Sequence, residues 1–354
     1  MKRQSGAVLL IVLWTAVLLT VLVTAMASKV RLSAQTAIHN QDVSMSWATI
    51  MGAINKAEME LMLERMQRPI GEQLEETQDG EVRTPAYRFN GQALELYYPL
   101  KENVTVRIFD HAGKINLNRI PRRNMQLLIE KRLGGQEADP EEVQDLLTAW
   151  TDWTDLNDLE GLNGAEKDYY ESLEQPYTPR NNPELDTVEE ILHIRGFKEL
   201  FAGTNLQAAF TIYGNTRTVN LNLATREAME LLPGLDGELI ENIIAYRAIE
   251  DINTRAEIAE IVPFEELQEL SPWVGSNTSN FYSLYAYENI MLDKEAEAQI
   301  DQDEFPNFDL VEQAYMEIIE VRGFNNLPTV HRVDPYSQLP DTGPPRVSEV
   351  ELLF

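Results

Sequence analysis

The sequence contains no cysteine, so disulfide bonds and thiolate chemistry are both excluded. Histidine is almost as scarce: His39, His111, His193 and His331 are widely scattered, which argues against a metal site built from several histidines. Basic residues are also few, since 29 lysines and arginines stand against 58 aspartates and glutamates, for a formal net charge of −29. Nucleic acid and anionic membrane surfaces repel such a chain, whereas hard cations and basic partners suit it.

Length and hydrophobic content indicate a folded protein of more than one unit. The chain has 354 residues, of which 44% are hydrophobic, enough to supply real cores. Domains of the usual size predict two or three units in a chain of this length.

A long apolar run begins close to the N-terminus. Residues 7–27 carry no charge, and about 21 residues make roughly 30 Å of helix, enough to cross a bilayer. Threonine hydroxyls within the run can bond a carbonyl one turn back. Lys2 and Arg3 favour a cytoplasmic N-terminus. A cleaved secretory signal is the alternative, because residues 25–27 read Ala-Met-Ala, although its apolar core is usually shorter, about 7–15 residues.

The helix is predicted to continue beyond the membrane. Residues 28–66 contain no proline and one glycine, Gly52. Apolar residues recur there at three- and four-residue spacings, which is typical of an amphipathic helix: Val43, Trp47, Ile50, Ile54, Met59 and Leu63.

The N-terminus resembles the leader of type IV pilin-like subunits. Lys-Arg-Gln-Ser-Gly6 stands directly before Ala7-Val-Leu-Leu-Ile11. The resemblance implies that a membrane prepilin peptidase cuts between Gly6 and Ala7, that Ala7 is then N-methylated, and that the apolar helix is kept. Pilins usually begin with Phe and have Glu at the fifth mature position, where this chain has Ala7 and Ile11. In lacking that glutamate, the chain resembles the K-type minor pseudopilin of type II secretion, the subunit at the filament tip.

Behind the long helix, the pattern predicts strands at both ends of a helical region. Residues 104–118 read as two strands joined by an Asp-His-Ala-Gly turn, a hairpin signal. Residues 124–133 and 140–153 are predicted helices, the second beginning at Asp139-Pro140. A helix–turn–helix is expected over 185–201, with strands over 208–215 and 281–292.

Residues 218–251 have the pattern of a helix-hairpin-helix. Leu-Pro-Gly-Leu-Asp-Gly, residues 232–237, joins two predicted helices, and Thr225 is the expected cap of the first. Such turns can bind phosphate through their amides and nearby lysines. Here Asp236, Glu238 and Glu241 stand where cations are needed, and Arg247 is the basic residue close by. A packing module is therefore favoured over a DNA-binding one.

The densest chemical signal is the acidic segment 149–174, in which carboxylates, amides and two glycines alternate. Calcium takes 6–8 oxygen ligands, so this composition suits it, although the EF-hand register is absent. Taken alone, the residues leave open a solvated acidic loop and, far less favoured, a glycosidase-like carboxylate pair.

The acidic segment also resembles the K-type family. The matching residues are Asp152, Trp153, Asp155, Gly164, Ala165, Glu166, Tyr169 and Tyr170. The resemblance implies a calcium loop, with the tyrosines and Trp153 anchoring it in the core. The expected ligands are Asp155, Asn157, Glu166 and Asp168, followed by Asp152 and Asp158. Asn157 replaces a common Asp of the family, which keeps an oxygen but loses a charge.

These features predict an α+β fold: a pilin-like long N-terminal helix packed on a small antiparallel sheet, with an inserted helical domain of the helix-hairpin-helix, SAM-like kind. The predicted divisions are a leader (1–6), a transmembrane helix (7–27), the pilin-like helix and first strands (28–120), a helical insertion with the acidic calcium-type loop (121–217), the helix-hairpin-helix module (218–275), returning strands (276–292), and an acidic, proline-rich tail that is partly disordered (293–354).

The implied function is structural, not enzymatic. The resemblance implies a single-pass inner-membrane subunit with a periplasmic head that caps the pseudopilus tip. Its implied partners are the I- and J-type minor pseudopilins, the prepilin peptidase and the inner-membrane secretion platform, with no nucleic acid. The alternatives are a membrane-anchored helix-hairpin-helix protein for DNA uptake, which needs a basic face, and an anchored calcium-dependent hydrolase, which needs a nucleophile or base beside the loop.

Overall fold

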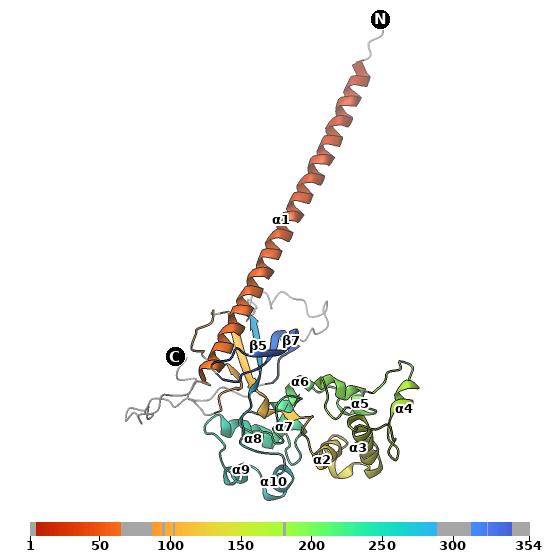
Figure 1. The fold of residues 1–354 in the computed structure, drawn as a ribbon. Coiled ribbons are helices and arrows are strands. Elements are labelled where there is room, and N and C mark those ends of the chain that lie inside the picture. Colours follow the sequence, from red (N-terminus) through yellow and green to blue (C-terminus); the bar gives the residue numbers. More distant parts are fainter. Residues whose placement is uncertain are drawn as a thin grey trace, which may run out of the picture. The chain divides into compact units, whose positions relative to one another are not determined.

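The computed structural model describes residues 5–64, 87–93, 96–101, 103–179, 182–288, 313–323 and 325–341. The chain divides into two compact units, 1–52 and 53–354, each described by itself below. Most of the predicted leader, residues 1–4, lies outside the described residues. The longest element is helix α1, Ser5–Glu64 (Figure 1).

Helix α1 is unbroken through the apolar run, as predicted. The hydroxyls of Thr15, Thr20 and Thr24 donate to carbonyls three or four residues back, at 2.8–2.9 Å. Each hydroxyl is thereby satisfied within the helix, without water. The three threonines of the run therefore need no partner from outside the helix.

The last turns of α1 belong to the second unit. Their buried apolar residues are Ala53, Ile54, Ala57 and Leu61. Glu60 is buried between them and accepts from Arg88 at 2.8 Å and from the backbone N–H of Tyr97 at 2.6 Å. Both bonds tie the end of the helix to the segment that leads into the sheet.

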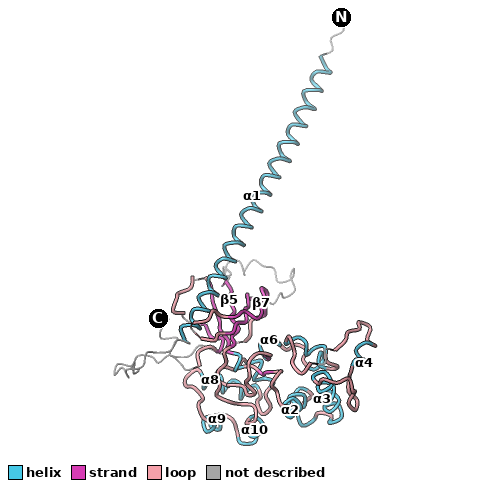
Figure 2. Tube along the Cα trace, viewed as in Figure 1, coloured by secondary structure: helices cyan, strands magenta, loops and turns pink. Residues whose placement is uncertain are grey.

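The second unit contains a five-stranded antiparallel sheet, which gathers in one place in Figure 2. The strand order is β1-β2-β5-β6-β7, with β1 Asn90–Ala93, β2 Val104–Asp110, β5 Phe281–Glu288, β6 Gln313–Glu320 and β7 Thr329–Gln338. Its core includes Phe109 and Tyr285, whose rings meet edge to face at 5.4 Å.

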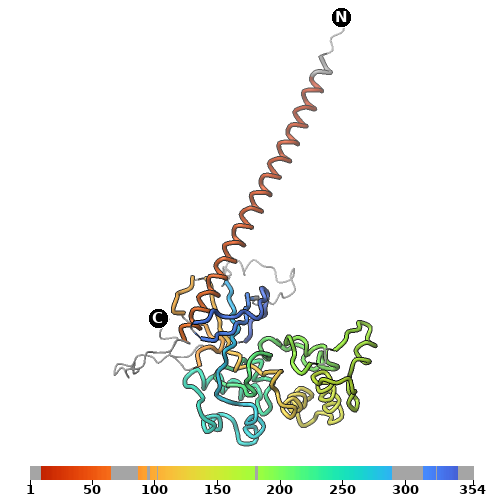
Figure 3. Tube along the Cα trace, viewed as in Figure 1, coloured from red at the N-terminus to blue at the C-terminus, as the bar shows by residue number. Residues whose placement is uncertain are grey.

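The helical region is inserted between two neighbouring strands. Strands β2 and β5 pair continuously from Val104 opposite Glu288 to Asp110 opposite Tyr282. Residues 111–280 therefore leave the sheet at the end of β2 and return to it at the start of the neighbouring strand β5, as the colours in Figure 3 trace. The predicted α+β class, with a long helix, an antiparallel sheet and a helical region, is confirmed.

The predicted hairpin over 104–118 is wrong. Strand β3, Ile115–Asn116, pairs in parallel with β4, Phe210–Thr211, and not with β2. Asp110 causes the departure, because its carboxylate caps a 3₁₀ turn, His111–Gly113, and also accepts from the backbone of Ser279. The turn directs the chain out of the sheet.

The predicted disorder of the tail is wrong for residues 327–338, which include β7. The tail also contains β6, and both strands extend the central sheet, while Asp341 forms an ion pair with Arg226 at 2.6 Å. Residues 293–312 and 342–354 of the predicted tail lie outside the described residues.

The proline in β7 explains why the sequence pattern did not predict this strand. Pro335 falls where the register shifts, between the pairs Ala314–Ser337 and Met316–Asp334. Strand β7 is at the edge of the sheet, and edge strands and bulges are where a residue without an N–H is tolerated. Strand β7 thus forms although it contains a proline.

The inserted region consists of short helices. They are α2 Arg122–Arg132, α3 Pro140–Thr154, α4 Lys167–Glu171, α5 Phe197–Leu200, α6 Leu206–Ala209, α7 Arg226–Leu231, α8 Gly237–Arg247, α9 Arg255–Ile261 and α10 Phe264–Leu270, with 3₁₀ turns at Gly135–Glu137 and Val188–His193. Asp139 caps α3 as predicted, accepting from the N–H of Glu141 at 2.9 Å. The helix predicted at the start of 185–201 is a 3₁₀ turn.

A buried polar cluster joins the sheet to the inserted region. His111 shares hydrogen bonds with Thr211 at 2.7 Å and Ser283 at 2.8 Å. The ammonium of Lys114 donates to the carbonyl of Gln207 at 2.8 Å and to the hydroxyl of Ser283 at 3.0 Å. Burial lowers the pKa of Lys114 to about 7, and nearby Glu227 opposes that shift.

Replacing Lys114 should change how stability depends on pH. The pKa is lowered in the folded state from 10.5 to about 7, so the unfolded state binds more protons between these values. Stability of the wild type therefore rises with pH in this window. From pH 7 to 9, denaturant unfolding of the full chain in non-ionic detergent should show a gain about 2 kcal/mol larger for the wild type than for Lys114→Met.

The matched control is Lys198→Met, because Lys198 is exposed. This variant should keep the pH dependence of the wild type. Equal gains for Lys114→Met and the wild type would contradict a lowered pKa at Lys114.

Candidate metal centre and helix pair

Three of the predicted ligands meet at the end of α3. Asp152 lies in the last turn of α3, Asp155 follows the helix as its C-cap, and Glu166 is the N-cap residue of α4. One carboxylate oxygen of each lies within 4.8 Å of those of the other two. The loop between α3 and α4 therefore folds back on itself and brings residues 11 to 14 positions apart into one cluster.

Asp152 organises this loop. Its Oδ2 atom accepts from the backbone N–H of Gly161 at 3.1 Å and of Ala165 at 3.0 Å. A Cβ atom on Gly164 would lie 1.8 Å from the same oxygen, so no other residue fits there without displacing the carboxylate. Asn163 adopts a left-handed φ of 53°, which asparagine tolerates better than most residues.

Glu166 is the residue that most needs a partner. Its side chain is 4% exposed, and neither carboxylate oxygen has a hydrogen-bond partner. Burial, together with the charges of Asp152, Asp155 and Asp158, raises the pKa of Glu166 to about 7, and the backbone N–H of Lys167 opposes this shift. A buried carboxylate without donors, beside two more carboxylates, fits a hard divalent cation that takes oxygen ligands.

Of the other predicted carboxylate ligands, Asp158 and Asp168 lie outside the 4.8 Å cluster. The amide of Asn157 is hydrogen-bonded within the loop, donating to Asp155 at 2.8 Å and accepting from the N–H of Leu159 at 2.8 Å. Asp158 is exposed but near enough to raise the pKa of Glu166. Asp168 is exposed in the first turn of α4.

Aromatic residues anchor the loop, as the sequence predicted. Trp153 is buried and meets the ring of Tyr170 edge to face at 5.0 Å, and Tyr170 is fully buried. The indole N–H of Trp153 donates to Glu190 at 3.1 Å. The two ends of the acidic loop are thereby fixed in the core of the inserted region.

Arg195 is a loop contact that the sequence did not indicate. Its guanidinium donates to the carbonyls of Asn163 and Gly164, the latter at 2.7 Å, and lies over the ring of Tyr169. It holds the left-handed turn beside the carboxylate cluster. Arg195 is far along the chain from the loop, so no local pattern could have predicted it.

The helices α7 and α8 are joined by the tight turn predicted from residues 232–237. Thr225 caps α7, accepting from Ala228 at 3.1 Å, and Gly234 has a left-handed φ of 76°. Arg247 is buried and donates to the carbonyls of Leu221 and Ala224 at 2.8 and 2.7 Å. The basic residue that the sequence placed near this turn is therefore committed to the protein interior. The helix-hairpin-helix interpretation itself stays a prediction.

Residues 113–202 match the family model described as type II secretion system (T2SS), protein K. This segment is a type II secretion system protein K domain. It runs from the end of the 3₁₀ turn after β2 to just past α5 and includes the acidic loop with all six predicted ligands. The resemblance to the K-type family is thus confirmed over these residues.

Among solved structures, the chain is similar to the crystal structure of the GspK-GspI-GspJ complex from the type 2 secretion system of enterotoxigenic Escherichia coli. The similarity has 11% sequence identity and a TM-score of 0.47, and it covers 85% of this chain and 98% of that chain. No curated protein matches the chain.

Outside the protein K domain, helix α1 is long and apolar enough to cross a membrane. Its most apolar window of 18 residues has a mean hydropathy of 2.6, and none of that window is buried. Length and composition alone support this assignment, which fits a single-pass anchor in front of a folded head.

Proposed function

We propose that this chain is a K-type minor pseudopilin that caps the tip of a type II secretion pseudopilus. With I- and J-type subunits it starts pseudopilus assembly and supports export of folded proteins across the outer membrane. The observation that carries the proposal is the protein K domain in a chain that begins with an unbroken apolar helix.

The N-terminal segment is the anchor of the subunit in this proposal. Prepilin peptidase removes residues 1–6 and leaves Ala7 as the methylated N-terminus. Helix α1 then holds the chain in the inner membrane near the secretion platform, with the head in the periplasm. The positive charges of Lys2 and Arg3, on the cytoplasmic side of the apolar run, support this orientation.

Ile11 supports a place at the tip. A carboxylate inside an apolar membrane helix is costly, by about 2.5–3.5 kcal/mol on insertion scales, so a pilin keeps one only where it has a partner. In an internal subunit that partner is the N-terminal amine of a neighbour. The subunit at the tip has no neighbour ahead of it, and Ile11 fits that position.

We propose further that the protein K domain binds calcium at the carboxylate cluster. Asp152, Asp155 and Glu166 hold the ion, and Asn157, Asp158 and Asp168 supply the rest of the predicted set. Bound calcium neutralises the carboxylates and stabilises the loop; it performs no reaction. The partnerless oxygens of Glu166 support this assignment. The mechanism of the subunit is packing rather than catalysis.

Deleting the gene in its own host tests the function. Proteins exported by the type II system should accumulate in the periplasm, and the wild-type chain on a plasmid should restore their release. A deletion strain with normal secretion contradicts the proposal. Normal secretion with lost DNA uptake would favour the DNA-uptake alternative, which the internal hydrogen bonds of Arg247 disfavour.

A further inference from the structure

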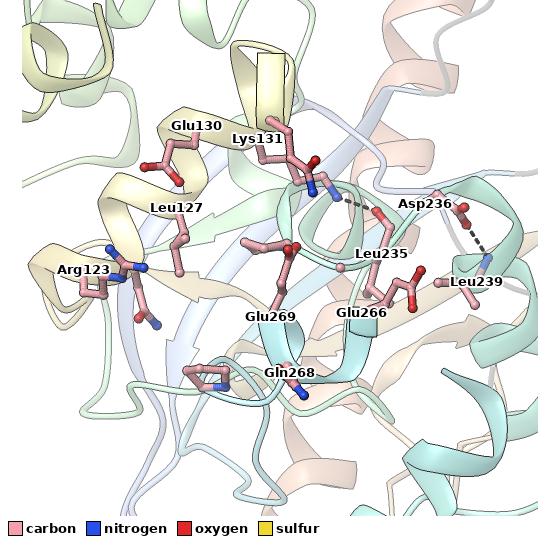
Figure 4. A pocket seen from close by; sticks show the side chains of 16 residues that line it. Arg123, Leu127, Glu130, Lys131, Leu235, Asp236, Leu239, Glu266, Gln268 and Glu269 are labelled. Atoms are coloured by element: carbon pink, nitrogen blue, oxygen red, sulfur yellow. Dashed lines mark hydrogen bonds between the residues drawn. The ribbon is translucent and has the colours of Figure 1, made fainter. Parts of the chain in front are cut away.

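A groove lies against the turn between α7 and α8, with a volume of about 640 Å³ (Figure 4). Three parts of the inserted region line it: α2 with the 3₁₀ turn after it, the turn 233–236 with the start of α8, and α10. These walls come from separate stretches of the chain, residues 123–136, 233–239 and 266–272, so the groove is a product of the tertiary fold.

The groove has an apolar lining. Its apolar residues are Leu127, Pro233, Leu235, Leu239 and Pro272. In Figure 4, Leu127 and Leu235 face the same space from opposite walls. Leu235 is buried and Leu127 and Leu239 are half-buried, so part of this lining stays open to an incoming side chain.

Acidic side chains border this apolar lining. The lining carboxylates are Glu130, Asp236, Glu266 and Glu269. Its cations are Arg123 and Lys131. Lys131 is occupied, because its ammonium donates to the carbonyls of Leu232 and Leu235 at 2.6 and 2.5 Å. The groove therefore presents negative charge around apolar surface.

The walls are fixed before any partner arrives. The carbonyl of Glu266 in α10 would lie 2.3 Å from a Cβ on Gly234, so turn and helix are in close contact. Asp236 caps α8, accepting from the N–H of Leu239 at 2.8 Å. Lys131 holds the same turn from the side of α2. A groove with preset walls loses less entropy on binding than a flexible one.

We infer that this groove binds a segment of a partner protein in which a lysine or arginine alternates with apolar side chains. The apolar side chain enters between Leu127 and Leu235, and the cation meets Glu266 and Glu269. The same carboxylates repel the phosphates of nucleic acid. A second copy of this chain is disfavoured, because each copy has a net charge of −29.

The test uses a fluorescein-labelled peptide, Lys-Leu-Lys-Leu-Lys-Leu-Lys, and the full chain in non-ionic detergent. Fluorescence anisotropy should show binding, and Glu266→Gln/Glu269→Gln should weaken it about fivefold, as expected for two partly exposed ion pairs. The matched control is Glu141→Gln/Glu142→Gln, which makes the same charge change at two exposed residues of α3. It should leave the affinity within about twofold.

Two further probes separate apolar from purely electrostatic binding. Lys-Gly-Lys-Gly-Lys-Gly-Lys has the same charge without leucine and should bind more weakly, since it leaves the groove lining exposed. A 20-base-pair DNA duplex should not bind. Equal affinity for both peptides, equal weakening in both double variants, or binding of the duplex in place of the peptide would each overturn the inference.

The absence of cysteine allows the site to be located directly. A single cysteine at Gln268, which lines the groove, can carry an environment-sensitive fluorophore, with Glu174→Cys on the exposed surface as its control. The leucine peptide should change the emission at position 268 and not at 174. An equal change at both positions, or no change at 268, would place the peptide elsewhere.

Discussion

A chain that carries Gly6→Asp is expected to keep Met1 at its N-terminus, whereas the wild-type chain should begin at methylated Ala7. The proposed peptidase cuts after a glycine, and an aspartate puts both a side chain and a charge next to the bond that is cut. Each leader is either cut or uncut, so the effect is complete rather than graded. An uncut leader leaves the two basic residues Lys2 and Arg3 on the subunit. Mass spectrometry of protein extracted from membranes distinguishes the two N-termini.

The control for this experiment is Gly52→Ala. Gly52 is a glycine of the same helix, and a Cβ atom there meets nothing within 4 Å. This variant should be cut and methylated like the wild type. A wild-type N-terminus beyond Ala27 would identify a cleaved secretory signal, and an intact Met1 in cells with active peptidase would exclude the pseudopilin proposal.

The elements that the sequence predicted correctly are set by local signals. Asp139-Pro140 begins α3, and Thr225 caps α7, because a side-chain oxygen and a nearby N–H suffice for each. The segment that became β5 also has a local signal, since it is rich in the aromatic residues that favour strands. Such signals need no knowledge of distant residues.

Two of the failures depend on distant residues. The hairpin prediction failed because Asp110 binds the backbone of Ser279, a contact across the whole inserted region. Strand β7 forms because it pairs with β6, and no pattern within residues 329–338 predicts that pairing. Pairing between distant strands is a property of the fold and leaves little trace in local periodicity.

In the acidic loop, too, local signals predicted some features, and others depended on the fold. Asp152 and Glu166 were predicted as ligands from composition and resemblance, and the loop brings them together. Asp168 follows Glu166 by two positions, in the first turn of α4, and its carboxylate lies outside the 4.8 Å cluster. Which carboxylates converge therefore depended on the helix start, which composition alone does not specify.

Chelating calcium should destabilise the full chain. If the carboxylate cluster binds the ion, calcium at about 100 times its dissociation constant stabilises the fold by about 2.7 kcal/mol. Thermal unfolding in detergent with calcium chloride or with EDTA measures the difference as a shift in Tm. Glu166→Gln should lose this shift without losing stability in EDTA, because it removes a buried charge that is repelled by Asp152 and Asp155.

Gly164→Ala should lose both the calcium shift and stability in EDTA. The new Cβ atom would lie 1.8 Å from Oδ2 of Asp152, which also accepts the N–H of Ala165 at 3.0 Å. Displacing that carboxylate breaks the loop as well as the cluster, at a cost of about 1–3 kcal/mol. Gly237→Ala is the control, because a Cβ there meets nothing within 4 Å, and it should keep the full calcium shift.

The two variants distinguish loss of calcium binding from loss of the folded loop. A charge effect alone predicts that Glu166→Gln removes the response to calcium while the loop stays folded, and a geometric effect predicts that Gly164→Ala removes both. Equal Tm values for the wild type in calcium and in EDTA would contradict the calcium site. The buried cluster would then rely on protonation of Glu166, whose pKa of about 7 leaves it half-protonated near neutral pH.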